Sequence, residues 1–169
     1  MNTANNTHGP RIDTSEAVDA ARRGILDYSL DKDPAVASAV KGGHPGTPLL
    51  VERLDRPGDA YYLVPWRTKE GVVFIVEVDA ATGAMLASST FPNPIPSPFL
   101  LPEDAAHCAA REFPQYTLGE PRLVWKPCRE STSSMRPFYQ VPFDHGFLYV
   151  DMEGSTLLEL TPLGLGGTH

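Results

Sequence analysis

A strand, a sharp turn and a second strand occur twice in this chain, and this repetition constrains the fold more than any other feature. The first copy is GVVFIVEVDAATGAMLAS at residues 71–88, and the second is HGFLYVDMEGSTLLEL at residues 145–160. Residues 74–78 alternate in the manner of a β-strand. Gly83 and Gly154 stand where each turn needs a residue with positive φ. We therefore expect two β-hairpins of the same kind.

The similarity extends to the residues that precede each hairpin. Apolar residues spaced three and four apart predict one helix in each copy; they are Val18, Ala21 and Ile25, and then Ala106, Ala109 and Phe113. A Gly-x-Pro strand start follows at Gly46 and at Gly119, and an aromatic-x-Val-Pro-aromatic strand follows at 60–66 and at 137–143. We expect two units, each a helix followed by a three- or four-stranded antiparallel β-meander.

The repeat also sets the expected domain boundaries. Asp13, with Glu16 three residues later, predicts a capped helix start, and Pro102 stands where a helix tolerates proline in its first turn. Prolines recur between the copies and favour an extended connector. The expected organisation is a disordered N-terminal tail at 1–12, a first repeat at 13–91, a Pro-rich connector at 92–101, a second repeat at 102–162 and a flexible tail at 163–169.

Residues 31–46 form an insertion that only the first copy contains. The second copy passes directly from Leu118 to Gly119, whereas the first adds DKDPAVASAVKGGHPG. This sequence predicts a short helix at 34–41 and then a glycine loop. Extra material on one repeat often carries function, but it also serves as a cap over the core. Both interpretations remain open.

The hairpins and the helix before them resemble the PepSY family, which usually ends in a strand, an Asp-x-x-Thr-Gly turn and a further strand. Asp79, Thr82 and Gly83 match that ending, whereas the second copy keeps only Glu153 and Gly154. The resemblance implies an α+β fold of two cystatin-like units, each a helix packed on an antiparallel β-meander. It implies inhibition or chaperoning of peptidases, often outside the cytoplasm, and no catalytic residues.

Charge and hydropathy limit the partners of this chain. The formal net charge is -7, so phosphate backbones repel it and we expect no nucleic acid partner. No apolar run is long enough for a membrane-spanning helix, so we expect no membrane insertion. The N-terminus lacks a signal peptide, which predicts a cytoplasmic protein, or an extracytoplasmic one if a leader was removed. A monomer and a homodimer fit equally well.

A thiol-based active site is the strongest catalytic hypothesis that the sequence offers, and we do not favour it. Cys108 with His107, His145 and Asp144 supplies a nucleophile, bases and an orienting carboxylate. However, Cys108 aligns with Ala20 at the margin of the apolar helix face, where cysteine packs as a small apolar residue. Ser38 and Lys41 match S-x-x-K, but the motifs that accompany it in enzymes are missing. We expect no catalytic residues and no enzyme.

Metal and cofactor sites are not predicted either. The five histidines never stand four residues apart or beside a cysteine pair, as zinc sites require. No nucleotide-binding glycine motif is present. Cys108 and Cys128 allow either one disulfide or two free thiols. The sequence therefore predicts no metal and no cofactor.

Aromatic residues on the predicted strands are the candidate binding residues. An exposed aromatic stripe marks an interaction surface, and the alternative is a core between the two units. The residues that we single out are Tyr62, Trp66, Phe143 and Tyr149. They suggest a protein or peptide partner.

We expect a non-catalytic protein- or peptide-binding module, of the peptidase-inhibitor or immunity type, that binds through a sheet edge or this aromatic face. One alternative is a small-molecule-binding or enzymatic cystatin-like cone domain. The other is a structural or assembly protein that dimerises through a sheet edge.

Overall fold

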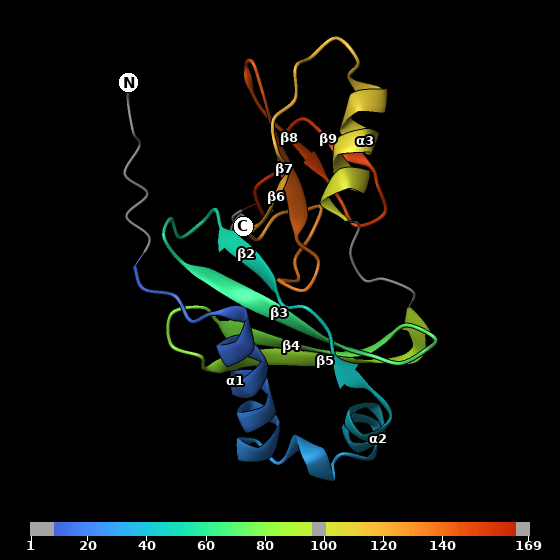
Figure 1. The fold of residues 1–169 in the computed structure, drawn as a ribbon. Helices are drawn as coiled ribbons and strands as arrows, with labels where there is room; N and C mark the ends of the chain where they lie inside the picture. Colours follow the sequence, from blue (N-terminus) through green and yellow to red (C-terminus); the bar gives the residue numbers. More distant parts are fainter. Residues whose placement is uncertain (1–8, 96–100, 165–169) are drawn as a thin grey trace, which may run out of the picture. The chain divides into compact units, whose positions relative to one another are not determined.

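The computed structural model describes residues 9–95 and 101–164, and it has an α+β fold (Figure 1). This confirms the expected fold class at that level. Contacts divide the chain into two compact units, Met1–Ser97 and Pro98–His169. Each unit is described by itself below.

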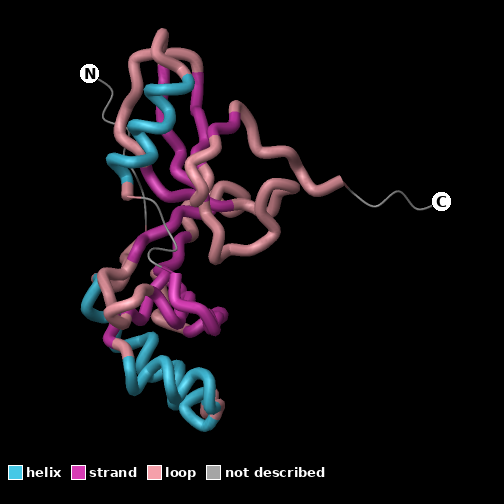
Figure 2. The backbone as a smooth tube through the Cα atoms, turned by 90° about the vertical axis from the view of Figure 1, so that its right-hand side faces the viewer, coloured by secondary structure: helices cyan, strands magenta, loops and turns pink. Residues whose placement is uncertain are grey.

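The first unit has its helices at the start and an antiparallel meander after them. The sheet order is β5-β4-β3-β2, and β1 pairs with β3 beyond the start of β2. Figure 2 shows the helices of this unit on one side of its strands. Its elements are α1 (Thr14–Asp27), the 3-10 helix η1 (Leu30–Lys32), α2 (Pro34–Gly42), β1 (His44–Pro45), β2 (Leu49–Arg53), β3 (Ala60–Arg67), β4 (Val72–Asp79) and β5 (Met85–Ile95).

Both helices of the first unit begin at an aspartate cap. Asp13 Oδ1 accepts a hydrogen bond from the Glu16 amide at 2.8 Å, and the Asp13 amide donates to Glu16 Oε2 at 2.7 Å. This reciprocal pair is the predicted capping box, and it satisfies amides that lack a partner within the helix. Asp33 caps α2 through the Ala35 amide at 2.8 Å. The helix expected in the insertion is confirmed.

The core of the first unit lies between the two helices and one face of the sheet. Because successive strand residues point to opposite faces, alternate residues of β3 and β4 supply the sheet side of this core. The buried residues of the cluster are Ala17, Ala20, Ala21 and Ile25 from α1, Val36 and Ala39 from α2, Ala60, Tyr62, Val64 and Trp66 from β3, and Phe74, Val76, Val78 and Ala80 from β4 and its end.

Two expected boundaries of the first unit differ from the structure. Ile12 does not belong to a disordered tail, because its amide donates to the Ala80 carbonyl at 2.8 Å and its own carbonyl accepts from the Tyr62 hydroxyl at 2.9 Å. Strand β5 continues to Ile95, into the expected connector. An edge strand tolerates Pro92 and Pro94 because it pairs on one side only. Residues 1–8, 96–100 and 165–169 lie outside the described residues.

The interrupted pairing beside β3 is fixed by a glycine and a proline. Pro65 has no amide to donate, and it lies opposite the gap between β1 and β2. The Gly46 amide closes this gap by donating to the Pro65 carbonyl at 2.7 Å. A Cβ atom at Gly46 would come within 3.3 Å of the Pro65 ring, so this close approach favours glycine.

The second unit has one helix followed by a meander. Its strands pair in the order β6-β7-β8-β9, all antiparallel, and α3 packs on β7, β8 and β9. The Gly119 amide donates to the Pro142 carbonyl at 2.8 Å, as Gly46 does to Pro65. The elements are α3 (Pro102–Glu112), β6 (Arg122–Trp125), β7 (Phe138–Phe143), β8 (Gly146–Val150) and β9 (Thr156–Leu157).

The strand register is the same in the two units at the positions that the sequence repeat aligns. Tyr62, Val64 and Pro65 of β3 lie opposite Val78, Val76 and Ile75. Their counterparts Tyr139, Val141 and Pro142 lie opposite Val150, Leu148 and Phe147. Leu50 pairs with Tyr62, and Leu123 pairs with Tyr139. A shift of one residue would turn every side chain to the other face.

The turn after each central hairpin is organised by an aspartate and a glycine. Asp79 Oδ1 accepts from the Thr82 amide at 2.7 Å, and Asp151 Oδ1 accepts from the Ser155 amide at 2.8 Å. Gly83 has φ 73° and Gly154 has φ 88°. The predicted left-handed conformation of both glycines is therefore confirmed.

A prediction concerns the contact of α1 with β5. A Cβ atom at Gly24 would lie 2.6 Å from Met85 Cβ, so Gly24→Ala forces backbone movement. We expect the free energy of unfolding to fall by about 1–3 kcal/mol, although alanine favours an isolated helix by about 1 kcal/mol over glycine. Gly42→Ala is the control, because nothing lies within 4 Å of the added atom. Urea unfolding measures both, and a more stable Gly24→Ala variant would contradict the packing.

A second prediction concerns the end of β2. Arg53 Nε and Nη2 donate to the two carboxylate oxygens of Asp55 at 2.8 and 2.6 Å, and this hydrogen bonding lowers the pKa of Asp55. A lowered folded-state pKa stabilises the fold above the ordinary value near 4, and the contribution is lost as the pH falls through the folded-state value. We expect Asp55→Asn to reduce the loss of unfolding free energy below about pH 4. Urea titrations from neutral to acid pH test this, and parallel curves for both proteins would refute it.

Candidate functional site

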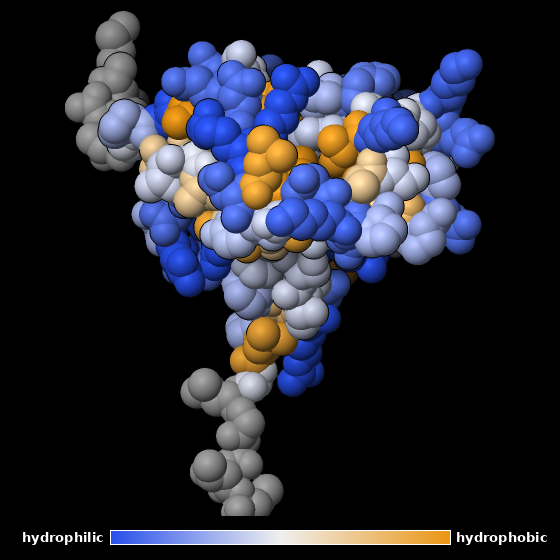
Figure 3. Space-filling model, turned by 90° about the horizontal axis from the view of Figure 1, so that it is seen from below, coloured by the Kyte–Doolittle hydropathy of each residue, from blue (hydrophilic) through white to orange (hydrophobic). Residues whose placement is uncertain are grey.

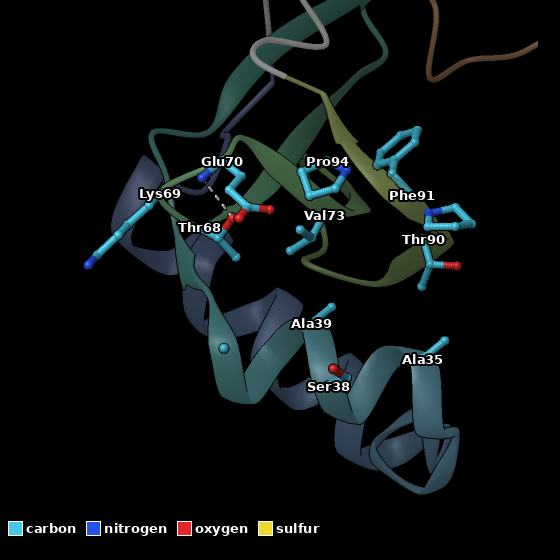
Figure 4. A pocket seen from close by; sticks show the side chains of 12 residues that line it. Ala35, Ser38, Ala39, Thr68, Lys69, Glu70, Val73, Thr90, Phe91 and Pro94 are labelled. Carbon is cyan, nitrogen blue, oxygen red and sulfur yellow. Dashed lines mark hydrogen bonds between the residues drawn. The ribbon is translucent and has the colours of Figure 1, made fainter.

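The first unit contains a pocket of about 680 Å³ that is open to solvent. Figure 4 shows that three segments surround it: helix α2, the turn from β3 to β4, and the end of β5. The residues that line it are Ala35, Ser38, Ala39, Gly42, Thr68, Lys69, Glu70, Val73, Thr90, Phe91, Pro92 and Pro94.

Small residues form the α2 wall of the pocket. Ala35, Ser38, Ala39 and Gly42 are three, four and seven positions apart, so they share one helix face. Large side chains at these positions would fill the space. Gly43, directly after the helix, lies close to the end of β3, because a Cβ atom there would lie 3.1 Å from the Arg67 carbonyl oxygen. The insertion therefore creates the pocket wall.

A tight turn forms the second wall. The Thr68 amide donates to the Gly71 carbonyl at 2.8 Å, and the Glu70 amide donates to Thr68 Oγ1 at 3.2 Å. Gly71 has φ 140°, which favours glycine. In Figure 4 the Lys69 side chain points away from the pocket, whereas the Glu70 carboxylate extends over it. The turn thus places one carboxylate at the mouth.

A bulge in β5 forms the third wall. Thr90 pairs with Phe74, and Ile95 pairs with Val72, so residues 91–94 lie opposite Val73 alone. Extra residues on one strand bend that strand away from its partner. Val73 then forms the floor, and it faces Ala39 in Figure 4.

The lining of the pocket combines apolar surface with a few polar groups. The lining contains apolar groups, three hydroxyls, one lysine and one carboxylate, with no histidine or cysteine among its residues. A nucleophile with an adjacent base is the signature of covalent catalysis, and the lining does not supply it. Ser38 of the S-x-x-K match lines the pocket, but Lys41 does not.

The surface seen from below the helices offers no broad apolar face. Figure 3 shows hydrophobic residues there as small areas among mainly hydrophilic ones. Leu26 and Tyr28 at the end of α1 are 64% and 65% exposed. Single exposed apolar residues are normal on a soluble protein, so the pocket is the stronger candidate.

Tyr62 and Trp66, two of the expected binding residues, are core residues instead. They are 6% and 2% exposed, and the Trp66 ring packs on Phe74 with centroids 5.8 Å apart. Alternation along β3 places Tyr62 and Trp66 on the same face of the sheet. That face is the one that α1 and α2 cover. The expected exposed stripe is therefore absent at these positions.

Phe143 and Tyr149, the other two, are half-buried in the second unit. Phe143 stacks on Tyr116 with centroids 4.6 Å apart, and Tyr116 stacks on Phe113. The Tyr149 hydroxyl lies 3.3 Å from Gln140 Nε2, which donates to it. These contacts hold the two side chains within their own unit, and they supply no pocket.

The residues of the hypothetical thiol active site do not come together in the structure. Cys108 is half-buried on α3 and His107 is exposed, while His145 lies in the turn after β7 with its ring edge against Phe143. Cys128 is buried, and burial raises the pKa of its thiol. Both cysteines are free. No hydrogen bond joins Cys108 to either histidine in the described ranges.

No group of three or more histidine, cysteine, aspartate or glutamate side chains among the described residues is placed to hold a metal ion. Among these same residues, no helix has both the length and the hydropathy to cross a bilayer.

Comparison with known proteins adds little. No protein-family model matches the chain, and no curated protein matches it. A crystal structure of a putative lipoprotein from Clostridium difficile 630 is similar over 76% of this chain and 89% of that chain, with 16% identity and a TM-score of 0.27. A TM-score this low does not indicate a shared fold.

Sequence reasoning missed the pocket. Its one signal was the insertion, whose small residues at helical spacing indicate a face that packs loosely or approaches a backbone. The pocket beside that face depends on the β5 bulge, which no sequence pattern indicates.

A third prediction separates the two thiols. Iodoacetamide at about pH 8 should alkylate Cys108 first, because thiolate formation and access both limit the reaction and Cys128 is buried with a raised pKa. Cys128 should react only after unfolding. Mass spectrometry of peptides measures each rate, and a thiol count without reductant is the control. Equal native rates, or no free thiols, would contradict the structure.

Proposed function

We propose that this chain is a non-catalytic protein- or peptide-binding module built from two PepSY-like, cystatin-like units. A peptidase inhibitor and an immunity-type partner are both binders of this kind. The proposal gives the protein no cofactor and no chemical step of its own. The protein would recognise its partner through main-chain hydrogen bonds and through contacts in the pocket.

The equal strand register supports the two-unit part of the proposal. Gly46 with Pro65 and Gly119 with Pro142 make the same hydrogen bond at aligned positions. Asp79 and Asp151 each follow the aligned valine and accept amide hydrogen bonds in the next turn, which reaches its glycine one residue sooner in the second unit. The glycine–proline hydrogen bond and the aspartate-led turn thus occur in the same order in both units, which supports a duplication.

The open edge of β5 is the observation that carries the function. In the described ranges β5 pairs with β4 and no other strand, and no residue of β5 is fully buried. Proteins usually protect such an edge with charge, proline or a bulge. Here Leu86 is bulged, and Pro92 and Pro94 follow, but residues 87–91 carry neither charge nor proline.

This edge suits the addition of an extended peptide. Such a peptide hydrogen-bonds along its backbone to the edge, and alternate side chains enter neighbouring pockets. The pocket beside Thr90 and Pro94 lies at the end of the unprotected segment. Affinity then comes from the edge, and specificity comes from the pocket.

A small-molecule-binding domain is the second candidate, because the pocket volume lies in the range of about 300–1,000 Å³ that ligands occupy. Dimerisation through the β5 edge is the third, because two copies of an open strand also pair. Light scattering distinguishes a dimer from a monomer, and the next experiment separates a peptide from a small molecule.

A fourth prediction tests strand addition. Selection from a displayed library of random dodecapeptides should yield binders, and amide hydrogen exchange should slow at residues 87–91 when a selected peptide binds. N-methylation of alternate peptide amides should weaken binding at least about tenfold, because each removes a main-chain donor at a cost of about 1 kcal/mol.

The control is the same peptide methylated on the other set of amides, which face away from β5. Strand addition predicts loss in one set and retention in the other. If both sets bind alike, or if protection appears only outside residues 87–91, the edge is not the binding site.

A further inference from the structure

We propose that the pocket between α2 and the β5 bulge recognises a lysine or arginine side chain of the bound peptide. This inference rests on the proposed function, because it takes the occupant to be a peptide that pairs with β5. It goes further by assigning the pocket a charge preference.

The charged groups of the lining point to a cation. Lys69 and Glu70 are its two charged residues, and only the Glu70 carboxylate extends over the pocket in Figure 4. In the described ranges this carboxylate has no hydrogen-bond or ion-pair partner. A guanidinium or ammonium group that reaches it forms a charge-assisted hydrogen bond.

The end of α2 adds to this preference. Gly42 is the last residue of the helix and lines the pocket. A helix C-terminus carries partial negative charge and favours cations. Lys41 stands in the same last turn, but it is not a lining residue.

The rest of the lining suits the aliphatic part of a long basic side chain. Ala39 and Val73 offer apolar surface below the Glu70 carboxylate in Figure 4, and Pro94 offers more beside it. Lysine and arginine place their methylene stems on such surface and keep the charged group in water. The net charge of -7 also attracts cationic peptides during diffusion.

The test compares selections from the dodecapeptide library on four variants and the natural protein. The natural protein should enrich a lysine or arginine flanked by a strand-forming run. Glu70→Gln should lose this enrichment, and Glu70→Lys should favour aspartate or glutamate. Lys69→Gln should keep the basic preference, because that side chain points away. Glu112→Gln is the matched control, since it changes the net charge equally from an exposed position on α3.

Affinity of one selected peptide gives the quantitative readout. Replacing its basic residue with norleucine should weaken binding to the natural protein about fivefold, and should leave binding to Glu70→Gln unchanged. Circular dichroism confirms that each variant is folded.

The outcomes separate the two proposals. If N-methylated peptides lose binding but norleucine has no effect on the natural protein, strand addition stands and the basic pocket is wrong. If the basic preference depends on Glu70 but N-methylation has no effect, the pocket stands and strand addition is wrong. Equal loss in Glu70→Gln and Glu112→Gln shows a net-charge effect, which also overturns the pocket. A library that yields no binder overturns both.

Discussion

In both units, the contact of a glycine amide with a proline carbonyl decides where the meander begins. Proline deprives its strand of one donor, so a neighbouring strand cannot pair there without loss. At this point the Gly46 and Gly119 amides donate to the carbonyls of Pro65 and Pro142, at 2.7 and 2.8 Å. A Cβ atom at Gly119 would lie 3.2 Å from the Pro142 ring. With this point fixed, the strands on either side pair in the same register in both units.

In the first unit the same constraint leads to the pocket. The gap opposite Pro65 separates β1 from β2, and the insertion enters the sheet through β1. Helix α2 is thereby brought against the end of β3, where Gly43 lies close to the Arg67 carbonyl. The β5 bulge leaves the opposite side open. The second unit has no insertion before Gly119, and its described residues 101–164 form no helix equivalent to α2.

Local features of this fold were predictable from the sequence, and features of packing were not. The capping box at Asp13, the left-handed glycines and the helix in the insertion depend on neighbouring residues. The burial of Tyr62 and Trp66 depends on which sheet face the helices cover, and alternation alone cannot decide that. Prolines near residue 92 suggested a connector. Strand β5 nevertheless continues to Ile95, because an edge strand needs backbone donors on one side only.

An open edge strand is a hazard to any folded protein, because two copies can pair through it. Net charge reduces this hazard, since chains that each carry -7 repel one another, most strongly at low ionic strength. The same field attracts a cationic peptide. Charge would therefore distinguish the proposed basic peptide from a second copy, although the backbones of both offer identical hydrogen bonds to residues 87–91. For the basic peptide that we propose, the acidity of the chain and the carboxylate at the pocket mouth would act in the same direction, both favouring that peptide over a second copy.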